Sequence, residues 1–138
     1  MKVLISAFTP FNKMTNNYSS EVLKYINGVD KIILDVVYDK SFEKLNSTFN
    51  LSEYDLLIAM GEARMRKELT VEKRAINLSS CSLADNSGVI KKDEKIILNS
   101  DEYLYTKLSI EESGMEISND AGKFVCNNIY YHLLFNYP

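Results

Sequence analysis

A cysteine at the start of a predicted helix is the residue best suited to chemistry in this sequence. Cys126 follows a turn at residues 119–122 and lies in the first turn or so of a helix expected over residues 122–135. The positive end of a helix dipole favours the thiolate form of a nearby cysteine, which is the reactive form. Position therefore allows a nucleophile at Cys126, but position alone favours a small buried core residue, because free cysteines are often buried.

A glutamate in the middle of an expected strand is the second candidate. Glu72 lies in the stretch TVEKRAIN, within a strand predicted over residues 69–78. A carboxylate in an apolar sheet needs a partner. Arg74 lies two residues away on the same face of the strand and would make an ordinary ion pair. A catalytic histidine is the alternative partner, and it would give Glu72 an orienting role.

The sequence contains one histidine, His132, six residues after Cys126 on the same predicted helix. Six residues turn a helix by about 600° and advance it by about 9 Å, so the imidazole points away from the thiol. A cysteine–histidine pair needs hydrogen-bond reach of roughly 3 Å. We therefore expect His132 to have a packing or surface role and not to act as the base for Cys126.

Strands and helices alternate in the first half of the chain. Apolar runs predict strands, and apolar residues at helical spacing predict helices, in the order strand 2–8, helix 21–26, strand 31–37, helix 41–50 and strand 55–60. This alternation is typical of a parallel sheet covered by helices. Beyond the strand at 69–78, we expect extended pieces at 89–98 and 103–108 and a brief strand at 115–118 before the last helix.

Length and charge exclude several classes of protein. The 138 residues fit one domain, and a net charge of −3 argues against a broad nucleic-acid-binding face. No apolar run reaches the roughly 18 residues of a membrane helix. The two cysteines lack metal-ligand spacing, and no dinucleotide-binding glycine pattern occurs, so we expect no metal and no cofactor. Free thiols favour a cytoplasmic location.

Four motifs, taken in order, resemble the pyroglutamyl peptidase I (pyrrolidone-carboxylate peptidase) family. The stretch SNDAGKFVCN at 118–127 is similar to the family's nucleophile segment, and TVEKRAIN at 70–77 to the segment with its catalytic glutamate. The turn ADNSG at 84–88 and the opening KVLISAFTPF at 2–11 resemble two further family segments. Any one of these would be weak evidence, but four in the right order cover most of the chain.

The resemblance implies a fold and an activity. The fold would be a three-layer α/β/α sandwich around a mixed, mostly parallel sheet, and the activity would be that of a cysteine peptidase removing N-terminal pyroglutamate from peptides. Cys126 would be the nucleophile and Glu72 the residue that orients a histidine. An apolar pocket suits a small uncharged lactam, and the positions matching that pocket are Phe8, Phe11, Leu83, Phe124 and Val125.

The sequence also departs from the family pattern. The resemblance implies a catalytic histidine on a strand beyond the helix that carries Cys126, then a C-terminal helix, and residues 1–138 contain no counterpart of either. Ser82 replaces an arginine, and Asn12 and Lys13 replace a pair of glycines. We therefore expect one shortened domain over residues 1–138 with weak or no activity. The alternatives are a non-catalytic binding module that keeps the pocket, or a separate chain that supplies the histidine.

The missing segment also predicts an association surface. Without a neighbouring strand and a covering helix, the edge at 115–118 and the apolar side chains of helix 122–135 would be exposed. We therefore expect a homo-oligomer, with a dimer favoured. The other expected partner is a small peptide or a pyroglutamate-like ligand. We expect no binding to nucleic acid or to a membrane.

Overall fold

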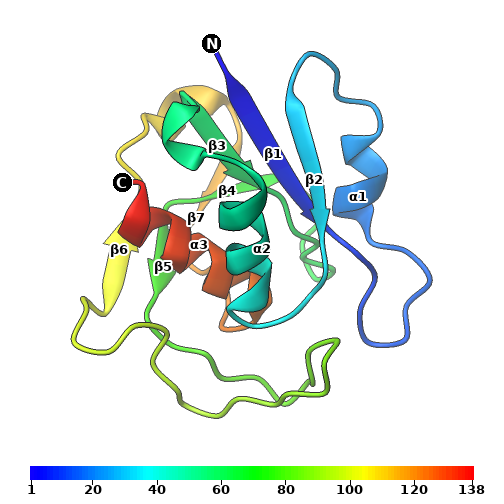
Figure 1. Cartoon of the computed structure of the whole chain (residues 1–138), viewed down its shortest axis with the longest axis vertical. Helices are drawn as coiled ribbons and strands as arrows, with labels where there is room; N and C mark the ends of the chain where they lie inside the picture. Colours follow the sequence, from blue (N-terminus) through cyan, green and yellow to red (C-terminus); the bar gives the residue numbers. More distant parts are fainter.

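A computed structural model describes the whole chain from Met1 to Pro138 (Figure 1). The strands are β1 (Val3–Phe8), β2 (Asp30–Leu34), β3 (Leu56–Ala59), β4 (Thr70–Glu72), β5 (Arg74–Ile76), β6 (Tyr103–Tyr105) and β7 (Glu116–Ser118). The α-helices are α1 (Tyr18–Leu23), α2 (Lys40–Thr48) and α3 (Val125–Asn136), and short 3₁₀ turns occur at Leu51–Glu53 and Ile110–Ser113. No helix of this chain combines the length and the apolar composition that a membrane span needs.

The first half of the chain forms a parallel sheet in the order β2-β1-β3. Leu4 aligns with Asp30 on one side of β1 and with Leu57 on the other. β1 is almost wholly buried because it lies between two strands and under helices. The alternation of strands and helices expected from the sequence is confirmed, with each strand slightly shorter than its apolar run.

The second half of the chain forms two small strand pairs. β4 pairs with β7 in parallel, and β5 pairs with β6 in antiparallel orientation. β4 and β5 belong to one extended segment, because the N–H of Lys73 between them donates to Ser118 and its C=O accepts from Thr106. The strand predicted over 69–78 is therefore shorter and divided between two partners.

The predicted extended piece at 89–98 is wrong: this segment contains no strand, and its one β-type pairing is an isolated bridge between Ser79 and Glu94. The buried side chain of Asn77 explains the irregular path. Its Oδ1 accepts from the N–H groups of Ile96 and Ile97, and its Nδ2 donates to the C=O of Ile97. A side chain therefore satisfies backbone groups that a neighbouring strand would otherwise bind.

Helices cover both faces of the first sheet, as expected for an α/β/α sandwich. α2 and α3 lie together on one face and enclose the largest core cluster, which includes Leu4, Leu45 and Ile129. α1 lies on the other face, where Leu23 packs against Ile5 and Ala7. The mixed and mostly parallel arrangement is the fold class that the sequence predicted.

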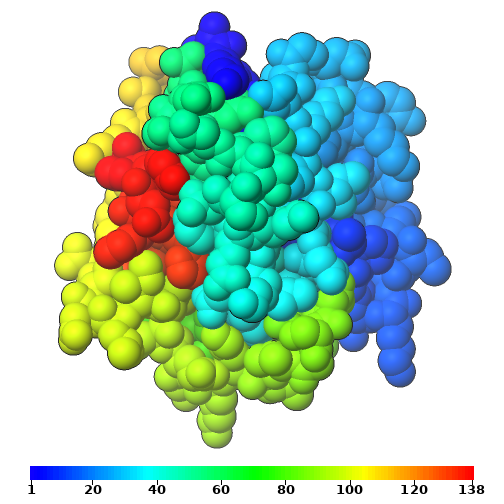
Figure 2. Space-filling view, in the orientation of Figure 1, coloured from blue at the N-terminus to red at the C-terminus, as the bar shows by residue number.

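The expectation of an exposed apolar face on the last helix is wrong. Tyr131 and Ile129 are fully buried, and Leu133 and Leu134 are nearly so, whereas Phe135 is about half exposed. Figure 2 shows the end of this helix wedged between α2 and the segment near residue 100. The second strand group and α2 cover the helix. An exposed helix face therefore no longer supports the predicted dimer, which stays a prediction.

Candidate active site

The thiol of Cys126 lies at the start of α3 and packs against a glycine. Cys126 is the second residue of the helix, and Phe124 precedes it in extended conformation without a side-chain cap. A Cβ atom placed on Gly61 would lie 2.5 Å from Cys126 Sγ, which is closer than such atoms approach. Gly61 follows β3 after one residue, so the close contact joins the end of the first sheet to the start of the last helix. Only glycine fits at residue 61 without displacing the thiol.

Burial controls the charge state of this thiol. Loss of solvent is the main reason that the pKa of Cys126 is raised to about 11; a backbone hydrogen bond lowers it by less, and the nearby charge of Glu72 makes a smaller upward contribution. The effect of the helix start is outweighed at this thiol, because burial penalises the thiolate more than the helix start favours it. At neutral pH the thiol is protonated, and it becomes a nucleophile only if a base removes its proton.

Glu72 has one oxygen in an ion pair and one without a partner. Its Oε1 lies 2.5 Å from a guanidinium nitrogen of Arg66. Its Oε2 is buried and accepts no hydrogen bond. The predicted pairing with Arg74 is wrong, since Arg74 donates instead to the C=O of Asn119. Glu72 therefore keeps a free buried acceptor, which is the atom that an incoming N–H group would need.

Arg66 was not identified by the sequence reasoning, because it lies in an irregular segment six residues before Glu72. Its guanidinium also donates to the Thr70 hydroxyl and to the C=O of Asp120, which lies shortly before α3. These contacts tie the Glu72 strand to the approach to Cys126. The sequence feature that could have identified Arg66 is an arginine close to a carboxylate in a strand. Many ordinary surface ion pairs share this feature, so it does not single out a functional residue.

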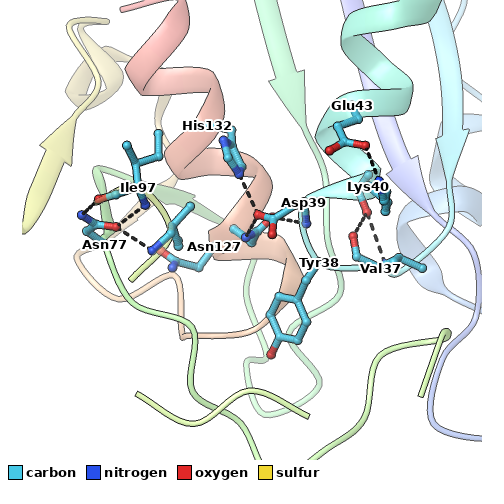
Figure 3. Close-up of polar contacts among 12 residues, drawn as sticks. Val37, Tyr38, Asp39, Lys40, Glu43, Asn77, Ile97, Asn127 and His132 are labelled. Atoms are coloured by element: carbon cyan, nitrogen blue, oxygen red, sulfur yellow. Dashed lines mark hydrogen bonds and ion pairs between the residues drawn. The ribbon is translucent and has the colours of Figure 1, made fainter. Parts of the chain in front are cut away.

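His132 is engaged by residues at the start of α2 (Figure 3). Its Nε2 lies 2.9 Å from Oδ1 of Asp39, and its ring stacks on Phe42 with centroids 4.9 Å apart. Asp39 also accepts from the side chains of Asn128 and Lys91. This polar cluster joins α2 to α3 and confirms the packing role expected for His132.

The chain contains no second imidazole, because His132 is the one histidine among the 138 residues. The chain also brings no three His, Cys, Asp or Glu side chains close enough together to hold a metal ion. The site therefore consists of a buried neutral thiol, a carboxylate with one free oxygen, and an arginine that fixes that carboxylate.

The sequence model of the family described as Pyroglutamyl peptidase matches residues 1–137. The chain belongs to the pyroglutamyl peptidase family. It is 33% identical over 150 residues to the pyrrolidone-carboxylate peptidase of Thermosipho melanesiensis and 34% identical over 150 residues to that of Brachyspira hyodysenteriae. These matches cover 98% of this chain but 74% and 75% of the two relatives.

Solved structures of the family agree with this assignment. The pyroglutamyl peptidase I of Bacillus amyloliquefaciens superposes with a TM-score of 0.88 at 30% identity, covering 98% of this chain and 72% of that one. The pyrrolidone carboxyl peptidase of Fervidobacterium islandicum superposes with a TM-score of 0.86 at 27% identity. About a quarter of each relative therefore has no counterpart among the residues of this chain.

The five residues matched to the family's lactam pocket are in three different environments. Phe11 and Phe124 pack together with ring centroids 5.6 Å apart beside the main core. Phe8 and Val125 are almost wholly inside that core, and Leu83 is on the surface at 36% exposed. The structure therefore brings the two phenylalanines together, while the ligand contacts of all five remain predictions.

Two further residues of α3 position the site and were not predicted. Asn127 binds both backbone groups of Ile76, accepting from its N–H at 3.0 Å and donating to its C=O at 2.9 Å. The hydroxyl of Tyr130 donates to the C=O of Glu72 at 2.6 Å. These contacts fix the helix that carries Cys126 against the strand that carries Glu72. The sequence feature that could have identified these two residues is their position, one and four residues after Cys126.

Proposed function

We propose that residues 1–138 act as one unit of a pyroglutamyl-peptidase-type cysteine peptidase that has its nucleophile and orienting carboxylate but no base within reach. Cys126 is the nucleophile in this proposal, and Glu72 is the orienting carboxylate. The observation that supports it best is the free buried Oε2 of Glu72, in a carboxylate close enough for its charge to raise the pKa of Cys126.

The reaction would proceed in two steps. A base takes the proton of Cys126, and the thiolate attacks the carbonyl carbon of the pyroglutamyl residue. The peptide C–N bond then breaks, and the leaving amine receives the proton from the base. Water hydrolyses the resulting thioester, which releases pyroglutamate and restores the thiol.

The base must accept the thiol proton with one atom and donate to Oε2 of Glu72 with another. An imidazole placed between them meets both needs. Arg66 holds the other carboxylate oxygen and leaves Oε2 for this contact. His132 is engaged by Asp39 and stacked on Phe42, so it does not fill the role. Loss of one member of such a catalytic set lowers turnover by several powers of ten.

The substrate in this proposal is a peptide with an N-terminal lactam. The lactam is small and uncharged, and the paired rings of Phe11 and Phe124 offer an apolar surface beside the start of α3. We assign these two rings to the lactam, Leu83 to the rim, and the buried Phe8 and Val125 to the support behind them.

A peptidase assay tests this proposal directly. The purified 138-residue chain is assayed with pyroglutamyl-aminomethylcoumarin beside a full-length relative, such as the Thermosipho melanesiensis enzyme. We expect turnover at least about a thousandfold below that of the relative. Turnover similar to the relative's, and lost in Cys126→Ala, would show that a base is present within these residues and would overturn the proposal.

A non-catalytic binding module is the second candidate, and the raised pKa of the Cys126 thiol favours it, because a protonated thiol is a poor nucleophile. Calorimetry with pyroglutamate separates the two readings. Saturable binding that persists in Cys126→Ala, with no turnover when a histidine-bearing fragment of a relative is added, supports the module. Turnover on addition of that fragment supports the incomplete peptidase.

A further inference from the structure

The hydroxyl of Tyr38 is buried and has no hydrogen-bond partner. Tyr38 lies between β2 and α2 and is 4% exposed, and no group of the chain bonds to its hydroxyl oxygen. The hydroxyls of two tyrosines on α3 are different, because those of Tyr130 and Tyr131 each donate to a backbone C=O at 2.6 Å. A buried hydroxyl without a partner lowers stability, since it has given up its hydrogen bonds to water. Such a group in a folded chain calls for an explanation, and a ligand that supplies the partner is one.

Tyr38 packs among the side chains that we assign to the lactam. It lies in the main core cluster with Phe8 and Val125, and Phe11 and Phe124 pack against that cluster. The rings of Tyr38 and Phe124 meet edge to face with centroids 5.5 Å apart. Phe11 lies 5.6 Å from Phe124. The ring of Phe124 is therefore flanked by both Phe11 and Tyr38.

The hydroxyl is directed to the segment that carries Leu83, which we place at the rim. The backbone N–H of Tyr38 donates to Oδ2 of Asp85 at 3.0 Å, and negative charge on Cys81 and Asp85 contributes to a raised pKa of Tyr38. Leu83 lies between these two residues in the chain. Figure 3 shows the ring of Tyr38 pointing away from His132. The hydroxyl therefore belongs to the lactam side of α3 and not to the polar cluster of His132.

The surroundings of Tyr38 make its hydroxyl a donor. Burial raises the pKa of Tyr38 to about 12, so the hydroxyl keeps its proton at neutral pH. The ammonium of Lys91 lies over the ring, 5.0 Å from its centroid, and helps to hold the ring in place. A carbonyl oxygen is an acceptor only, so it matches this donor. An uncharged ring that bears a carbonyl also avoids the cost of burying a charge among apolar side chains.

We propose that Tyr38 is a specificity-determining residue whose hydroxyl donates a hydrogen bond to the ring carbonyl of a lactam that packs against Phe124. The proposal rests on the proposed function for the place of the lactam, but its test measures binding and not turnover. The hydroxyl is covered in the free chain, so the ligand displaces a side chain at the rim to reach it. Phe11 and Phe124 are half-buried and Leu83 is on the surface, so none of them is enclosed by the core.

Three uncharged ligands with the same ring size separate the carbonyl contact from ring packing. Pyroglutamamide has a ring carbonyl and a ring N–H, 3-oxocyclopentanecarboxamide has the carbonyl alone, and cyclopentanecarboxamide has neither. Calorimetry measures the affinity of the 138-residue chain for each. We expect both carbonyl ligands to bind about three- to tenfold more tightly than cyclopentanecarboxamide, which is the range for one hydrogen bond between neutral groups.

Tyr38→Phe removes the hydroxyl and keeps the ring. This variant should bind cyclopentanecarboxamide as the parent chain does and lose the preference for the two carbonyl ligands. It should also raise the Tm of the free chain, because it removes a buried hydroxyl that has no partner. A gain in stability together with a loss of carbonyl preference is the result that a purely structural role of Tyr38 would not give.

Tyr131→Phe is the matched control. Tyr131 is also fully buried, but its hydroxyl contacts the C=O of Asp101 and the hydroxyl of Ser100. This variant should lower the Tm and keep the carbonyl preference. Circular dichroism checks that both variants fold. If Tyr38→Phe does not fold, the chemical shift of the Tyr38 Cζ carbon in the unaltered chain decides, because pyroglutamamide should move it more than cyclopentanecarboxamide does.

Each outcome bears on the proposal. Equal affinity of the parent chain for all three ligands, a carbonyl preference that persists in Tyr38→Phe, or a Tm lowered by Tyr38→Phe as by Tyr131→Phe would overturn it. Turnover with the histidine-bearing fragment, together with a carbonyl preference unchanged in Tyr38→Phe, would overturn the role of Tyr38 and leave the proposed peptidase in place. Loss of the preference in Tyr38→Phe, without turnover on addition of the fragment, would support the role of Tyr38 and count against the peptidase.

Discussion

The reactivity of Cys126 follows from its burial and can be worked out from the structure. Its pKa of about 11, compared with an ordinary value of 9.0, leaves roughly 100-fold less thiolate at neutral pH, because each pKa unit is a tenfold change. We therefore expect Cys126 to react with iodoacetamide at least about 100-fold more slowly at pH 7 than an exposed cysteine. Restricted access of the reagent would slow the reaction further.

The pH dependence separates the charge effect from access. The alkylation rate is proportional to the thiolate fraction. Restricted access therefore lowers the rate at every pH, but it does not change the pH at which the rate levels off, which is set by the pKa. In a Cys81→Ser background, which leaves one thiol, the rate should rise about tenfold per pH unit from pH 6.5 to 9.5 without levelling. Mass spectrometry at timed intervals gives the rate, and the urea-unfolded chain serves as the reference.

A matched variant tests the assigned cause. Glu72→Gln removes the charge that contributes to the raised pKa of Cys126 and keeps the side chain's size. The variant should therefore react faster than the parent at the same pH, by less than the effect of burial. A rate curve that bends below about pH 8.5 in the parent chain would refute this reasoning, because it would mean that the helix start outweighs burial.

Three further outcomes are expected from the contacts around the site. Gly61→Ala should lower the free energy of unfolding by about 1–3 kcal/mol, because its methyl group would lie 2.5 Å from Sγ of Cys126. Adding Cys126→Ala to this variant should restore much of the lost stability. Urea titrations of the single and double variants measure both effects. Asn127→Ala should cost roughly 2–4 kcal/mol, since the N–H of Ile76 loses its partner and the C=O groups of Ile76 and Leu78 each lose a donor, and a Tm unchanged in calorimetry would contradict it. The contacts of Asp39 hold its pKa below the ordinary value, so its stabilisation is present above about pH 4 and is lost as the pH falls further. Unfolding curves of Asp39→Ala and the parent should thus differ most at pH 7 and draw steadily closer as the pH falls below about 4, and a constant difference would count against the assignment.

Local patterns were sufficient for most of the elements. The apolar runs around β1, β2 and β3 predict strands because a buried parallel strand has apolar residues on both faces. The spacing of Phe42 and Leu45 predicts α2, since residues three apart share one helix face. The turn at 119–122 indicates a helix that starts close before Cys126, and α3 begins at Val125. These features depend on residues that are near one another in the chain.

The site depended on contacts that no local pattern contains. Which arginine meets Glu72 was decided by the path of the segment before β4, and it was Arg66, not Arg74. The segment at 89–98 looked extended, but Asn77 binds its backbone groups from far along the chain.

The sequence by itself therefore determined the order of the elements and placed a cysteine at a helix start and a glutamate in a strand. The tertiary structure alone decided that the thiol is buried against Gly61, that its pKa is high, and that His132 is bound to Asp39. The physical reason is that periodicity and turn signals act over a few residues, whereas burial and the choice of polar partner depend on segments brought together by folding.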